Sequence, residues 1–123
     1  MRQQILIIPG ELTTMNKMTL QNRTHWAVGA KNKKENTHYI TSLCDIQKIK
    51  PVKNPPDFDV VFYRKDKRTE KDNCLSQMKD ILDGLVMAGV LEDDRWDNYG
   101  GMSFDWVIDS KNPRIEVSII DEL

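Results

Sequence analysis

The strongest constraint on the fold lies between residues 57 and 89, where a strand pattern gives way to a helix pattern. The segment FDVVFY combines β-branched and aromatic residues and predicts a strand over about 57–64. A helix is predicted from about Asn73 to Ala88, because Asp72 is a good N-cap and Gly89 ends it. The highly charged connector RKDKRTEKD joins these two elements.

The rest of the chain predicts further strands and one more helix. QQILIIPG predicts a first strand, residues 11–24 a loop, and the segment from about Trp26 to Lys48 a helix. The segments MSFDWVIDS and RIEVSII alternate in polarity around the turn signal KNP, so we expect them to form an antiparallel hairpin. The order β-α-β-α-β-β predicts a single α+β domain over 1–123, with a mixed β-sheet covered by helices.

Composition places the chain among ordinary globular proteins. Its 123 residues suffice for one domain, and 30% of them are charged. No apolar run approaches the roughly 20 residues of a membrane helix, and ILII is too short for a signal peptide, so we expect a cytoplasmic protein without a membrane partner. Cys44 and Cys74 lack a CxxC pairing, which argues against a disulfide scaffold or a zinc site.

The small net charge hides an uneven distribution. Residues 1–71 carry a net charge of +7, whereas residues 72–123 carry −8. A basic half suggests a polyanionic partner, and an acidic half suggests bound cations. Composition alone favours the alternative that these charges only solvate the surface.

Acidic residues and a lysine gather around the second predicted helix. On a helical wheel, the apolar residues of this helix form one stripe, made of Leu75, Met78, Leu82, Leu85 and Val86. Asp72, Lys79 and Asp83 fall along one border of that stripe. Glu70 precedes them, and Asp94 lies on a segment that must return beside the helix if the predicted hairpin joins the sheet. Carboxylates of this kind suit Mg²⁺, and a lysine beside them suits charge stabilisation in phosphodiester hydrolysis. The alternative is structural: an N-cap and an i,i+4 ion pair.

The connector before this helix is strongly basic. Its cations could contact phosphates and offset the repulsion between the acidic residues and DNA, or they could belong to a solvated loop. They are Arg64, Lys65, Lys67, Arg68 and Lys71.

The block RTEKDNCLSQMKDILDGLVMAGVLEDD, from Arg68 to Asp94, resembles the RusA family of phage and prophage Holliday-junction resolvases. The family pattern of acid, any residue, Asp-Asn, lysine, Asp-x-Leu, Ala-Gly and a final Asp is present in order. The N-terminal segments IIPGEL, QNR and WAVGAKNKK and the closing NPRIEVSI are similar to family members from phages of Gram-positive bacteria, so the resemblance covers nearly the whole chain.

The resemblance implies an Mg²⁺-dependent endodeoxyribonuclease, with Mn²⁺ as a possible substitute and no nucleotide cofactor. It would resolve four-way DNA as a homodimer in recombination and repair. Asp72 and Asp94 would bind the metal together with Glu70, which stands where many relatives have Asp. By the same resemblance, Lys79 would be the essential lysine, Asn73 would help to shape the site, and Asp83 would be a supporting acid. Further DNA contacts would come from Arg23, Lys31, Lys33 and Lys34.

Two departures from the family pattern keep another interpretation open. Glu70 is one methylene longer than Asp, and the spacing from Asp72 to Lys79 is longer than in the best-known member. A branched-DNA-binding protein without cleavage activity is therefore the alternative function, and a host-interaction module is a weaker one.

Overall fold

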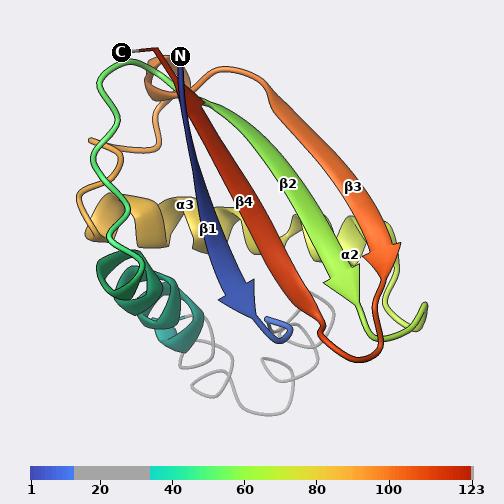
Figure 1. Ribbon diagram of the computed structural model, residues 1–123. Helices are drawn as coiled ribbons and strands as arrows, with labels where there is room; N and C mark the ends of the chain where they lie inside the picture. The colour runs from blue at the N-terminus through green and yellow to red at the C-terminus, as the bar shows by residue number, and fades with distance from the viewer. Residues whose placement is uncertain (13–33, 123) are drawn as a thin grey trace, which may run out of the picture.

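The computed structural model describes residues 1–12 and 34–122, apart from the side chain of Trp96. Residues 34–46 are helical and precede β2 (Figure 1). The other elements are β1 (Arg2–Pro9), β2 (Asp57–Arg64), α2 (Lys71–Leu75), α3 (Gln77–Met87), the short 3-10 helix η1 (Trp96–Asn98), β3 (Met102–Ile108) and β4 (Arg114–Asp121). The predicted α+β class and the order β-α-β-α-β-β are confirmed, with α2 and α3 together as the second helical segment.

The four described strands form one mixed sheet in the order β1-β4-β2-β3. β4 is antiparallel to both of its neighbours, whereas β2 and β3 are parallel. The register places Val117 of β4 between Leu6 of β1 and Val60 of β2. All three side chains are buried, so one row of the core runs across the middle of the sheet.

The predicted hairpin of the last two strands is wrong, because β2 lies between them. The chain leaves β3, crosses the end of β2 and returns as β4 (Figure 1). At the crossing, the backbone N–H of Asp109 donates to the carbonyl of Arg64 at 2.7 Å, and the guanidinium of Arg114 lies 3.7 Å from the centre of the Tyr63 ring. Alternating polarity fixes which face of a strand is buried but not which strand lies beside it.

One face of the sheet is covered and the other is open. Ile115, Val117 and Ile119 of β4 are almost completely buried, whereas Ile5 and Ile7 of β1 project from the other face and are exposed. The covering layer is α2 and α3, which run behind the strands in Figure 1. Because side chains alternate between faces, the buried face fixes the register of the strands.

The second helical segment differs in detail from the predicted continuous helix. Glu70, and not Asp72, occupies the N-cap position, and its side chain makes no capping hydrogen bond. Asp72 instead accepts a hydrogen bond from the N–H of Asn73 at 3.0 Å. The segment is interrupted between α2 and α3 at Ser76, whose hydroxyl donates to the carbonyl of Asn73 at 2.7 Å. Such local bonds compete with the regular helical pattern.

The buried stripe of this segment is also displaced from the predicted one. Ile81, which was not predicted to face the core, is fully buried, and Leu75, which was, is 37% exposed. α3 has 11 residues. No helix within the described ranges has the length and apolar character needed to cross a membrane.

The β1 edge of the sheet is protected by a side chain. The amide of Gln47, just after the helical residues 34–46, donates to the carbonyl of Ile7 at 2.7 Å and accepts from its N–H at 2.9 Å. Gln47 therefore takes the place of a neighbouring strand at one position. Edge groups satisfied in this way are not available for pairing with another chain.

The helical residues 34–46 pack closely on α3 at Gly84. A Cβ added at Gly84 would lie 2.5 Å from Cγ2 and 2.7 Å from Cβ of Ile40, and the hydroxyl of Thr41 donates to the Gly84 carbonyl at 3.2 Å. Ile40 is fully buried, so it has no open space into which to move. Glycine is therefore needed where the two helical segments meet.

Replacement of this glycine should destabilise the protein. We expect Gly84→Ala to lower the free energy of unfolding by about 1–3 kcal/mol, because the added methyl group overpacks the contact with Ile40. Chemical denaturation monitored by circular dichroism would measure the change. Met87→Ala on the exposed side of the same helix is the control and should change stability by less than about 0.5 kcal/mol. An unchanged denaturation midpoint for Gly84→Ala would show that the two segments do not pack this closely.

Candidate functional site

The structure brings Lys79, Asp83 and Asp94 together, and we refer to these three residues as the acid–lysine cluster. The Lys79 ammonium forms an i,i+4 ion pair with Asp83, with Nζ and Oδ1 3.1 Å apart. It also donates a hydrogen bond to the carboxylate of Asp94, from the loop that follows α3. Residues from two separate elements thus converge on one ammonium group, as expected for a segment that returns beside the helix.

The path of the chain after α3 explains how Asp94 reaches Lys79. Gly89 has a φ of +77°, which favours glycine and turns the chain at the end of the helix. The N–H of Val90 then donates to the carbonyl of Leu85 at 2.9 Å, and the side chains of Val90 and Leu91 are buried. These contacts fix the start of the loop against α3 and leave Asp94 beside Lys79.

Asp93 and Asp94 are adjacent, but they have different partners. Asp93 accepts hydrogen bonds from the backbone and side chain of Arg95 at 2.9 and 2.8 Å, and also from the side-chain amide of Asn98. These bonds, chiefly those from Arg95, lower the pKa of Asp93 to about 2. Asp93 therefore organises the loop, while Asp94 is the acid that joins the acid–lysine cluster.

The charges in the acid–lysine cluster stabilise one another. The hydrogen bond to Asp94, followed by the one to Asp83, raises the pKa of Lys79. The same interaction lowers the pKa of Asp94. All three side chains remain accessible, with exposures of 55% for Lys79, 30% for Asp83 and 32% for Asp94. A charged ammonium is therefore held near neutral pH where a ligand can approach it.

A shallow pocket of about 440 Å³ lies beside the acid–lysine cluster. Asp83 and Asp94 form part of its wall, and the remainder comes from Thr37, Val86 and Met87. The helical residues 34–46 and α3 both contribute to it. The cluster is therefore at the edge of a depression rather than on a flat surface.

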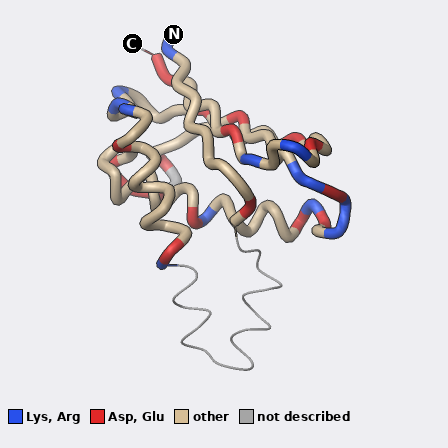
Figure 2. Tube along the Cα trace, turned by 60° about the horizontal axis from the view of Figure 1, so that its bottom comes forward, with Lys and Arg blue, Asp and Glu red and all other residues tan. Residues whose placement is uncertain are grey.

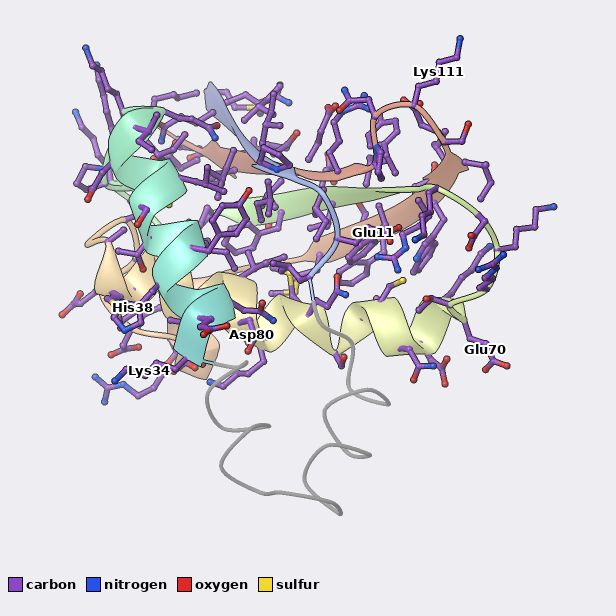
Figure 3. The ribbon with its side chains drawn as sticks, turned by 90° about the horizontal axis from the view of Figure 1, so that it is seen from below. Glu11, Lys34, His38, Glu70, Asp80 and Lys111 are labelled. Atoms are coloured by element: carbon purple, nitrogen blue, oxygen red, sulfur yellow. The ribbon has the colours of Figure 1, made fainter. Side chains whose placement is uncertain are left out.

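Glu70 and Asp72 lie at the other end of the helical segment. Asp72 is seven residues before Lys79, which corresponds to about 10 Å along a helix axis. Figure 3 shows Glu70 far from Asp80, the neighbour of Lys79 in the sequence. Within the residues that the structure describes, no group of three or more His, Cys, Asp or Glu side chains is placed to hold a metal ion.

The three-carboxylate magnesium site therefore stays a prediction. Glu70, Asp72 and Asp94 do not meet at one point in the described part of a single chain. The donor set available there does not fit a resident Mg²⁺, which prefers several oxygen ligands in a near-octahedral arrangement. We derive no chemical step through a metal from this geometry.

The basic connector divides into exposed and buried cations. Four of its five cationic residues, Lys65, Lys67, Arg68 and Lys71, are exposed, and Figure 2 shows this charge at the turn between β2 and α2. Arg64 is different, because it is only 6% exposed and its Nε lies 3.2 Å from Oε2 of Glu11. The four exposed residues are free to approach a polyanion, whereas Arg64 is part of the interior.

The structure describes only some of the other predicted site residues. Lys34 is exposed at the start of the described helical residues, and Asn73 is half-buried in α2. Arg23, Lys31 and Lys33 lie outside the described residues, as do most of the predicted loop and the first part of the predicted helix before β2.

Sequence reasoning missed two buried polar residues near the predicted site. Asp80 is 2% exposed and accepts a hydrogen bond from Nδ2 of Asn36 at 3.1 Å. Gln77 is fully buried and donates to the carbonyl of Leu12 at 2.9 Å. On a helical wheel both share a face with Ile81, so the displaced stripe is the signal that would have found them.

Comparison with known proteins adds no family to these observations. No protein-family model matches this chain, and neither does any curated protein sequence. The similarity to the RusA family therefore remains a prediction from the sequence motif.

The pKa of Lys79 offers a direct test of the acid–lysine cluster. Asp94 makes the larger contribution, so Asp94→Asn should lower the pKa of Lys79 more than Asp83→Asn does. Heteronuclear NMR of the labelled lysine side chains during a pH titration would measure both changes. Asp97→Asn, an exposed substitution in the same loop, should leave the value unchanged. A larger effect of Asp83→Asn would show that Asp94 is not the main partner.

Proposed function

We propose that this chain is a structure-selective endodeoxyribonuclease that acts on branched DNA, above all on four-way junctions. The observation that supports it most is the contact between Lys79 and Asp94. These two residues lie 15 positions apart, and the sequence motif assigns both of them to catalysis. Their convergence at the edge of a pocket is the arrangement that a phosphodiester-cleaving site needs.

Lys79 has the chemistry to stabilise a phosphoryl transition state. Its ammonium is charged, because its carboxylate partners raise its pKa, and more than half of its side chain is accessible. A flexible lysine can exchange a carboxylate for a phosphate oxygen when DNA approaches. Cations aimed at the oxygen atoms on which charge develops are among the largest contributions to catalysis.

The exposed cations of the connector would provide affinity for DNA. Lys65, Lys67, Arg68 and Lys71 lie on and beside the turn that precedes α2. Neutralising phosphates with such residues releases counterions, which makes binding strong at low salt and weak at high salt. It would also offset the repulsion between DNA and the acidic residues 70, 72, 83 and 94.

The proposal includes a divalent cation and a second copy of the chain, both carried over from the motif. The motif implies Mg²⁺, or Mn²⁺ in its place, at Glu70, Asp72 and Asp94, but the described part of a single chain does not bring these acids together, so the proposal assigns no step to the metal. A four-way junction presents two equivalent strands, and a dimer with two-fold symmetry would present two equivalent sites to them. Paired cuts would then resolve the junction.

The alternative is a protein that binds branched DNA without cutting it. The observation that favours it is the separation of Glu70 and Asp72 from Asp94 within one chain. If these acids never meet, the basic surface would remain as a binding surface with no hydrolytic centre.

Cleavage of a synthetic four-way junction in the presence of Mg²⁺ distinguishes the two proposals. We expect Asp94→Asn, Asp72→Asn and Lys79→Met each to reduce the cleavage rate about 100-fold or more, because the motif assigns the two acids to the metal and Lys79 to the charge of the transition state. Gel-shift binding of the same junction should change little. The control is Asp97→Asn, which makes the same Asp-to-Asn change at an exposed position of the loop that carries Asp94. This variant should cleave the junction at the rate of the unmodified protein.

Two results would contradict the proposed nuclease. Cleavage that persists in both aspartate variants would show that these acids do not act in the reaction. Tight junction binding by the unmodified protein, without cutting in either Mg²⁺ or Mn²⁺, would favour the DNA-binding alternative.

A further inference from the structure

A second pocket, of about 400 Å³, lies between β3 and the start of α2, away from the acid–lysine cluster. Three of its lining residues are cations: Arg64 at the end of β2, and Lys67 and Lys71 from the connector and α2. Trp106 of β3 forms part of the wall. We refer to this cavity, defined by these four residues, as the Arg64–Trp106 pocket.

Two residues of the pocket wall, Arg64 and Trp106, carry buried donors whose hydrogen-bonding capacity is unused. Within the described residues, Nε and Nη1 of Arg64 and Nε1 of Trp106 are buried and have no hydrogen-bond partner. The Arg64 side chain is 7% exposed, and its ion pair with Glu11, at 3.2 Å, does not supply a hydrogen bond to these atoms. An unsatisfied buried donor is costly to the folded state, so such groups call for an acceptor.

All of these unused groups are donors, and this restricts the ligand. Guanidinium and indole nitrogens carry N–H groups and no acceptor. A ligand that satisfies them must supply several acceptor oxygens, and beside the ammonium groups of Lys67 and Lys71 it should also be negatively charged. A phosphate group meets both conditions, and arginine binds it with particularly good geometry.

The Trp106 ring is not free to stack on a base. One face lies against Phe62, with centroids 5.6 Å apart and an angle of 16° between the planes. The Lys71 ammonium lies over the ring at 5.2 Å from its centroid. The ring is held in place by these contacts, so its N–H edge is the part that can contribute to binding. This favours recognition of a phosphate over recognition of a nucleobase.

Two acids also line the pocket and limit what it can hold. Asp66 lies near Arg68, with Oδ2 and Nε 3.5 Å apart, and Glu70 is exposed at the rim. The lining holds three cations and two acids, and Glu11 outside the lining pairs with Arg64, so the ammonium groups of Lys67 and Lys71 supply the charge that is open to a ligand. The pocket therefore suits a single phosphate group better than a highly charged polyphosphate.

We propose that the Arg64–Trp106 pocket is a phosphate-binding site that uses the N–H groups of Arg64 and Trp106 and the ammonium groups of Lys67 and Lys71. This goes beyond the proposed nuclease, because it requires neither cleavage nor a four-way junction. The exposed lysine side chains would move to admit the ligand, and the Arg64 guanidinium would turn toward it. The phosphate belongs either to a DNA backbone or to a free phosphate ion.

NMR spectroscopy of the full chain, labelled with nitrogen-15, tests the site through the signal of the Trp106 indole N–H. Inorganic phosphate is titrated against sodium chloride of equal ionic strength, and the Trp106 signal is assigned by its loss in Trp106→Phe. We expect phosphate to shift this signal saturably. Calorimetry should show that Trp106→Phe and Lys67→Ala each weaken phosphate binding about three- to tenfold, as expected for one lost hydrogen bond or ion contact.

Lys111→Ala is the matched control, because Lys111 is an exposed lysine that neither lines the pocket nor belongs to the basic connector. It should change phosphate affinity by less than about twofold. Trp106→Phe keeps an aromatic ring against Phe62, so a cooperative thermal transition of this variant would show that its weaker binding is not unfolding.

A short single-stranded oligonucleotide without terminal phosphates distinguishes the two sources of phosphate. Competition between the oligonucleotide and inorganic phosphate for the Trp106 signal would assign the site to a DNA backbone. Saturable binding of phosphate without such competition would assign it to the free ion. No saturable shift with either ligand, or equal losses in Lys111→Ala and Lys67→Ala, would overturn the proposal whether or not the protein cuts DNA.

Discussion

The packing of α3 against the covered face of the sheet is the interaction on which the rest of the structure depends. Leu82 and Leu85 of the helix and Val117 at the centre of the sheet belong to one continuous core. Burial of this apolar surface fixes the rotation of α3 about its axis. Lys79 and Asp83 therefore lie at its accessible border, and Asp94 reaches them when the chain turns back after Gly89.

The two ends of this helical segment carry different chemistry. At the end near residues 34–46, the acid–lysine cluster holds a charged ammonium between two carboxylates, beside a pocket. At the other end, Arg64 and Trp106 contribute buried donors to a second pocket, and the basic connector surrounds it. A polyanion that follows the helix would meet cations first and the acid–lysine cluster further along. This arrangement is consistent with the proposed action on DNA.

Much of the fold could be predicted from the sequence. The strand at 57–64 agrees with the structure residue for residue, because β-branched and aromatic side chains fit a buried strand, and Pro56 and Lys65 bound it. The break at Ser76 could not be predicted, since it depends on a local hydrogen bond to Asn73. Leu75, on the apolar border of the regular wheel, is exposed, and Ile81 is buried.

For the site, the sequence by itself determined which acidic residues, which lysine and which basic connector are available, and in what order they follow one another along the chain. It also determined that Lys79 and Asp83 share a helix face, because their spacing of four residues is local. Only the tertiary structure decided that β2 separates β3 from β4, that Asp94 and not Asp93 meets Lys79, and that Arg64 is buried. The physical reason is that these outcomes depend on contacts between distant segments, which compete for the same core and which no local pattern records.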